Sequence, residues 1–177
     1  MSQVSKLNQV NSKLGATMPG QQTTRYIYDS VSSAAGQRFY EFFTNFNGKT
    51  EFQTNLTTNK LDSSESMVIK SIFVSCTDFI QGNRINKLNI YVGNQCVIKD
   101  LPLAFNAGNK GTSYARISSA ANEVRQLEIR LLTDIVIPPQ TTFKATLETS
   151  SDPTQVGDNV TLGLRGYGVI FSAGSTF

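Results

Sequence analysis

The chain has 177 residues, of which 39% are hydrophobic, and this is enough for a single domain with a sizeable core. Its formal net charge is only +3, and its 16 Lys and Arg residues are spread along the chain, so it lacks the clustered basic residues of a specific nucleic-acid binder. His and Trp are absent, and without His the chain can form neither a Ser-His-Asp triad nor the usual zinc site.

The N-terminal residues 1–22 are polar and carry only isolated apolar side chains, among them Val4, Leu7 and Leu14. They lack the apolar core of a signal peptide, so we do not expect classical secretion. The segment closes with the turn signal Met18-Pro19-Gly20. We expect either a frayed terminus or an arm that becomes ordered against a neighbouring subunit or another surface, with these three apolar residues as contacts.

An aromatic stretch at residues 38–46 is predicted to form a strand, and residues 50–56 to form its hairpin partner. Asn47-Gly48 lies between them, and this dipeptide favours a two-residue hairpin turn. The first strand has apolar side chains on both faces, so one face should be covered by another layer or subunit. Phe42 and Phe46 are therefore our candidate subunit contacts within the domain.

Residues 67–76 are apolar on both faces and are predicted to form a central strand, with Met67, Ile69 and Phe73 on one face. Gly93-Asn94 favours a second hairpin. Residues 118–122 are expected to make one helical turn at most. Further strand-like runs are predicted at residues 25–31, 87–92, 95–98, 114–117 and 160–171, and we expect eight or nine strands in the folded chain.

Residues 124–148 show the clearest strand pattern in the chain. Apolar and polar side chains alternate in both halves, as expected when one strand face packs on a core. Pro138-Pro139 lies between the halves and cannot donate to a sheet ladder, so the chain must turn a corner there or run along an edge. Two half-buried strands around such a corner predict an antiparallel β-sandwich.

The sequence contains no recognisable catalytic or cofactor-binding motif. We therefore expect neither an enzyme nor a bound metal or cofactor. No phosphate-binding glycine motif occurs at a strand-to-helix junction. Glu128 and Glu148 fall on polar strand faces, where solvated surface is the default, and Arg165 is expected to make a structural ion pair or hydrogen bond. Cys76 and Cys96 lie in apolar runs and are expected to be buried free thiols, although their pairing stays open.

The order of these motifs resembles that of the jelly-roll capsid proteins of small tailless bacteriophages, especially those with an internal membrane. The resemblance covers residues 38–171. The stretches that carry it are 42–56, 67–75, 88–95, 101–103, 137–143 and 160–166.

This resemblance implies an all-β chain: a single eight-stranded antiparallel jelly-roll sandwich at residues 23–177, with an extended N-terminal arm at 1–22. It implies a structural virion protein that self-assembles as a pentamer or higher capsomer into an icosahedral shell. Such a chain would be a major capsid or pentameric vertex protein, in contact with other capsid proteins and, through its arm, with a viral membrane. It would be assembled in the host cytoplasm and located in the virion.

Two other functions stay open on the sequence. The first is a carbohydrate-binding β-sandwich module, or a viral spike or attachment protein, in which exposed aromatic side chains hold the sugar. Tyr114 is the best candidate for that role. The second is a secreted cytokine-like jelly roll, which the missing signal peptide disfavours.

Overall fold

The computed structural model describes residues 20–77, 85–104, 112–119, 122–149 and 159–171, and side chains within 22–75, 87–103, 128–149 and 159–170. These residues contain nine β-strands and no α-helix. The strands are β1 Gly20–Ser32, β2 Phe39–Phe42, β3 Glu65–Thr77, β4 Ile85–Val92, β5 Gln95–Ala104, β6 Thr112–Ser119, β7 Asn122–Ile137, β8 Phe143–Thr149 and β9 Asn159–Phe171.

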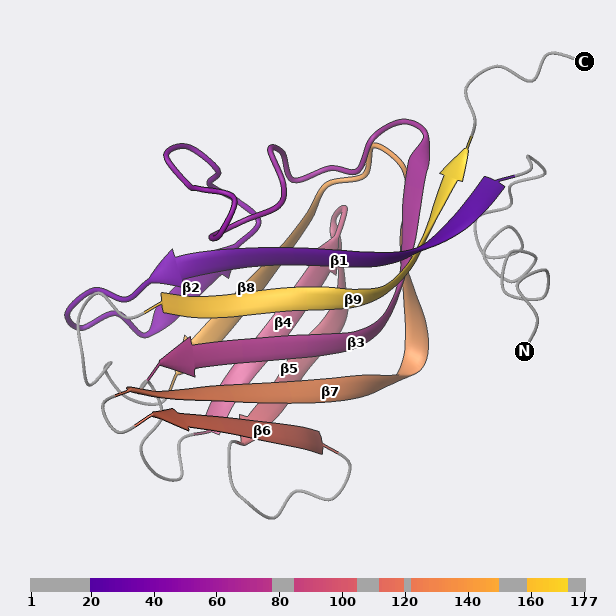
Figure 1. Cartoon of the computed structure of the whole chain (residues 1–177). Helices are drawn as coiled ribbons and strands as arrows, with labels where there is room; N and C mark the ends of the chain where they lie inside the picture. The colour runs from indigo at the N-terminus through magenta and orange to yellow at the C-terminus, as the bar shows by residue number, and fades with distance from the viewer. Residues whose placement is uncertain (1–19, 78–84, 105–111, 120–121, 150–158, 172–177) are drawn as a thin grey trace, which may run out of the picture.

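The strands form two antiparallel sheets that pack face to face as a β-sandwich (Figure 1). The five-stranded sheet has the order β1-β9-β3-β7-β6, and the four-stranded sheet has the order β2-β8-β4-β5. Strands that are neighbours in a sheet are therefore mostly distant in sequence. The chain crosses between the layers after β1, β2, β3, β5, β7 and β8, which confirms the predicted all-β class.

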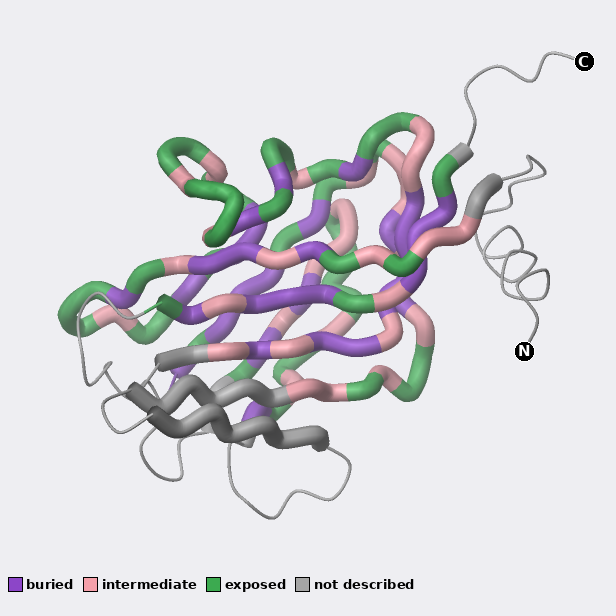
Figure 2. The backbone as a smooth tube through the Cα atoms, viewed as in Figure 1, coloured by how far each residue is buried: buried purple, intermediate pink, exposed green. Residues whose placement is uncertain are grey.

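The core lies between the two sheets and is dominated by large apolar side chains. Buried residues line the centre of the five-stranded sheet along β1, β9 and β3 (Figure 2). Burying such side chains contributes about 1.5–3 kcal/mol each relative to exposure. The largest fully buried side chains are those of Tyr40, Phe42, Phe43, Phe143, Ile27, Leu61, Met67, Ile69, Ile72 and Leu88.

The predicted central strand is confirmed as β3, which pairs with β7 on one side and β9 on the other. Its register shifts between Ile69 and Ser71 in both ladders, so Lys70 is a bulge residue. A bulge inserts one residue and reverses the alternation of faces beyond it. For this reason Ile69 and Ile72 share the core, whereas Phe73, which we predicted on the same face as Ile69, lies on the opposite face.

The predicted proline corner is also confirmed. β7 ends at Ile137 in the five-stranded sheet, and β8 begins at Phe143 in the other sheet. Both of these residues are buried in the core, at 0% and 2% exposure. Pro138 and Pro139 thus carry the chain from one layer to the other, where neither residue has to donate to a ladder.

The predicted aromatic hairpin is wrong. β2 covers only Phe39–Phe42 and pairs with β8, while residues 43–64 form a long connection with isolated bridges. Phe43 adopts a positive φ of 63° and turns the chain away from β2. Its N–H donates to Asp29 Oδ2 (2.7 Å), and Lys49 Nζ binds Asp29 Oδ1 (2.6 Å), so a buried carboxylate on β1 holds this connection.

The same connection covers part of the exposed edge of β1. Ser30 N donates to Gln53 O (2.7 Å), Tyr28 N donates to Asn55 Oδ1 (3.0 Å), and the Asn55 amide donates to Tyr26 O (2.7 Å). Unpaired edge groups invite pairing with another chain, and loops commonly cover them. Residues 53–55 therefore cover the edge of β1 and do not form the hairpin that the local sequence favours.

Three boundaries differ from the sequence expectation. β1 begins at Gly20, so the last three residues of the predicted arm belong to the sheet, and Val4, Leu7 and Leu14 lie outside the described residues. β6 extends through Ser119, where we expected a helical turn to begin. Cys96 is a free thiol as expected but is exposed, because it follows the β4–β5 turn; the Cys76 side chain lies outside the described part.

Within the described ranges, no helix is long and apolar enough to span a bilayer.

Candidate functional site

The outer face of the five-stranded sheet, which points away from the four-stranded sheet, carries two of the four described ion pairs, Arg165–Glu128 and Lys70–Asp134. One row crosses four strands, β1, β9, β3 and β7, through Tyr26, Arg165, Ser71 and Arg130. The neighbouring row contains Tyr28, Gly163, Phe73 and Glu128. The face therefore combines aromatic rings with charged groups, and Phe73 is the apolar side chain that β3 contributes to these two rows.

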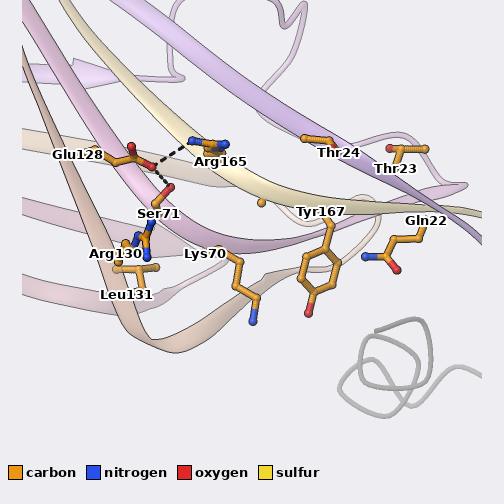
Figure 3. A pocket seen from close by; sticks show the side chains of 11 residues that line it. Gln22, Thr23, Thr24, Lys70, Ser71, Glu128, Arg130, Leu131, Arg165 and Tyr167 are labelled. Atoms are coloured by element: carbon orange, nitrogen blue, oxygen red, sulfur yellow. Dashed lines mark hydrogen bonds and ion pairs between the residues drawn. The ribbon is translucent and has the colours of Figure 1, made fainter. Parts of the chain in front are cut away.

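A hollow of about 610 Å³ opens on this face where β3 is bulged (Figure 3). It lies within the size range of small-molecule sites. Only one of its lining residues, Leu131, has an aliphatic side chain. The others are Gln22, Thr23, Thr24, Lys70, Ser71, Glu128, Arg130, Arg165, Gly166 and Tyr167.

Glu128 is the centre of the network in this hollow. Its Oε1 accepts a hydrogen bond from Ser71 Oγ (2.8 Å) and forms an ion pair with an Arg165 guanidinium nitrogen (3.3 Å), as Figure 3 shows. The Arg165 guanidinium also lies 5.3 Å from the centre of the Tyr26 ring. This confirms the structural ion pair predicted for Arg165. Arg130 has no hydrogen-bond or ion-pair partner among the residues that the structure describes.

A second ion pair, between Lys70 and Asp134, lies at the bulge. The Lys70 ammonium is also 5.3 Å from the centre of the Tyr167 ring. Partial burial on its own lowers the pKa of Lys70. The hydrogen bond to Asp134 and the attraction of Tyr167 and Asp134 outweigh this effect and raise that pKa above its ordinary value of 10.5.

The Lys70–Asp134 pair predicts a pH-dependent contribution to stability. Because the pKa of Lys70 is raised by folding, the contribution is complete below pH 10.5 and is lost as the pH rises through the folded-state pKa. The Lys70 side chain is 43% exposed, so Asp134→Asn should cost no more than about 1 kcal/mol at neutral pH. Urea unfolding of both proteins over a pH series would test this. A difference that is constant or grows with alkaline pH would contradict it.

The aromatic residues on this face also cover glycine backbone. A Cβ atom added at Gly163 would lie 1.9 Å from Phe73 Cζ, so the Phe73 ring occupies the space above this glycine. The Phe73 ring is 6.5 Å from the Tyr26 ring, centre to centre. Gly163 is thus required by close packing on the outer face.

The sequence-predicted contact residues lie elsewhere. Phe42 is 0% exposed and belongs to the core of a single chain, so it cannot contact a second subunit in this conformation. The short β2 strand turns its side chain inward against β8, which corrects our expectation. Phe46 is half-buried against the same core, and its role in a subunit contact stays a prediction.

Two residues that sequence reasoning did not single out are the most exposed apolar side chains in the described part. Phe52 is 95% exposed, in the connection between β2 and β3, and Leu132 is 104% exposed, in β7. Leu132 belongs to residues 131–134, which lie opposite the single bulge residue Lys70. The alternation in the sequence stops at Leu131-Leu132, where the insertion begins, but this break does not reveal how many residues are inserted.

The two carboxylates considered from the sequence, those of Glu128 and Glu148, lie on different sheets. Glu128 lies on the outer face of the five-stranded sheet, whereas Glu148 is exposed on the outer face of the four-stranded sheet. Hydrolysis of a glycosidic bond by paired carboxylates needs both in one cleft. No group of three Cys, Asp or Glu residues suited to a metal ion is found within the described residues. The Tyr114 side chain lies outside them.

Comparison with known proteins provides no family for this chain. No family model matches it, and no curated protein matches its sequence. Among solved structures, a chain from the infectious bursal disease virus Gt strain aligns over 89% of this chain and 33% of that chain, with 15% identity and a TM-score of 0.31. A likeness at this level carries no argument about function.

Proposed function

We propose that this chain is a structural virion protein, a single jelly-roll capsid subunit that self-assembles into an icosahedral shell. The observation that carries the proposal is the strand order. β1-β9-β3-β7 opposes β2-β8-β4-β5, and β6 is an additional edge strand. A jelly roll consists of eight strands in two sheets joined by Greek-key crossings, and this order is consistent with that connectivity.

The strand order alone does not select a capsid role, because jelly rolls also occur in lectins. Self-association is favoured by exposed apolar side chains on segments that connect or interrupt the strands. Phe52 and Leu132 each present almost their whole side chain to solvent. A contact that buries one such side chain gains about 1.5–3 kcal/mol.

The edge of β1 supports the same proposal. Residues 53–55 cover this edge from Tyr26 to Ser30. Before Tyr26, no hydrogen bond between described residues reaches the outer edge of β1. A neighbouring chain could pair there, since exposed sheet edges are common sites of strand addition.

Assembly should depend on the exposed apolar side chains and not on the stability of the monomer. We expect Phe52→Ser and Leu132→Ser to shift purified protein from capsomers or closed particles toward monomers. Neither change should lower the thermal midpoint, because neither side chain is in the core. Light scattering after size-exclusion chromatography, with electron microscopy, would measure the distribution.

The exposed neighbour Glu51→Ser provides a control at the same loop, because it changes a polar side chain without removing apolar area. It should assemble like the wild type. A wild-type protein that stays monomeric at every concentration would contradict the proposed function. Normal assembly of both serine variants would exclude these two side chains as contacts.

A further inference from the structure

The hollow over the β3 bulge has the chemistry of a site for a polyhydroxylated ligand. Its lining combines donors and acceptors with little aliphatic surface, and Gln22, Thr24 and Tyr167 bring amide and hydroxyl groups to it. Apolar ligands need a pocket lined mainly by hydrophobic side chains, which this hollow lacks. Its volume of about 610 Å³ is also far larger than an inorganic anion requires.

The hollow also has an excess of positive charge. Lys70, Arg130 and Arg165 line it, against Glu128 as the single acidic lining residue. Asp134 neutralises Lys70 from beside the hollow, which leaves one unmatched cation among the described groups. Arg130 is exposed and has no partner among the described residues. Its guanidinium can therefore bind a ligand carboxylate without breaking an existing ion pair.

Arg130 and Arg165 flank Ser71 on the two neighbouring strands. Two strand spacings, about 10 Å, separate the backbones of these two arginines, which is wider than one sugar ring. Arg165 uses only one nitrogen, at 3.3 Å, to bind Glu128, so further N–H groups are available to ring hydroxyls. Glu128 itself can accept hydrogen bonds from ligand hydroxyls through its second oxygen.

From this arrangement we propose that the hollow binds an acidic saccharide, a sugar ring that carries a carboxylate. Arg130 binds the carboxylate, and Arg165 and Glu128 bind hydroxyl groups of the ring. A phosphate would meet the same cations but would leave most of the hollow unfilled. The site is separate from the proposed self-assembly, and nothing in it depends on the shell.

Titration calorimetry on the full-length chain would test this, with methyl β-D-glucuronide and N-acetylneuraminate as probes. Methyl β-D-glucoside is the neutral match of the first probe, and inorganic phosphate is the simple anion. We expect at least one acidic sugar to bind roughly tenfold tighter than the glucoside, since a charge-assisted hydrogen bond distinguishes them. Any acidic sugar that binds should bind more tightly than inorganic phosphate.

Arg130→Gln should weaken binding of the acidic sugar by roughly tenfold and leave the thermal midpoint unchanged. Lys87→Gln removes an exposed cation from the four-stranded sheet and should have no effect on binding. The proposal is overturned if no acidic sugar binds better than the glucoside, if phosphate binds as tightly as the sugars, or if the two variants lose affinity equally. None of these results would bear on assembly.

Discussion

Replacing Gly166 by Ala is expected to destabilise the fold by about 3 kcal/mol, the upper part of the usual range for overpacking. A Cβ atom there would lie 1.9 Å from the backbone oxygen of Val68 and 2.9 Å from its carbonyl carbon. Val68 lies two residues before the bulge residue Lys70, where the ladder shifts register. Backbone atoms cannot move aside by a rotamer change, so β9 and β3 would have to separate.

Gly163→Ala provides a matched control on the same strand. Its added Cβ would clash with the ring of Phe73, whose side chain is half-buried and can move toward solvent. We expect a loss of about 1 kcal/mol in the wild-type background and no further loss when Gly163→Ala is added to Phe73→Ala. Gly166→Ala should be equally destabilising in both backgrounds. Urea unfolding would measure the three single and two double variants, and equal stability of the two single Gly→Ala variants would contradict the predicted difference.

Asp29→Ala is expected to cost about 3–5 kcal/mol, the usual result of removing one partner of a buried ion pair. Asp29 is 0% exposed, and its carboxylate binds both Lys49 (2.6 Å) and the Phe43 N–H (2.7 Å). The Lys49 side chain is only 15% exposed, so its ammonium would lose its partner with little access to water. Denaturant unfolding would measure the loss.

Asp29→Asn separates the two contributions, because the amide oxygen can still accept from Phe43 N–H while the charge is lost. It should cost less than Asp29→Ala. Lys49→Met should also be destabilising, since it leaves Asp29 buried and unpaired. A stability change below about 1 kcal/mol in Asp29→Ala would mean that the connection at residues 43–64 is held by other contacts.

The alternating pattern of the sequence was sufficient for the all-β class. The central position of β3 followed from a run that is apolar on both faces, and the corner after Ile137 followed from Pro138 and Pro139. Each of these signals lies in a short stretch and does not depend on the strand's partners. The sequence predicted that Arg165 forms an ion pair or hydrogen bond, but it did not predict the partner. Its partner Glu128 is 37 residues away in sequence and could not be identified without the pairing of β7, β3 and β9.

The aromatic hairpin and the contact role of Phe42 failed for a different reason. The pattern at residues 38–56 is compatible with a hairpin, but Asp29 on β1 binds the Phe43 N–H and β8 pairs with β2. These contacts join residues that are far apart in sequence. A local pattern therefore cannot show that they are more stable than the hairpin turn that Asn47-Gly48 favours.

Sequence periodicity alone determined that this protein contains half-buried strands, because apolar side chains recur at every second residue on the strand face that packs on the core. Only the tertiary structure decided which strands are neighbours, where Lys70 interrupts the alternation, and that polar groups from four strands surround one hollow. The physical reason is that strand pairing and register are set by contacts between residues far apart in sequence, which a local pattern does not contain.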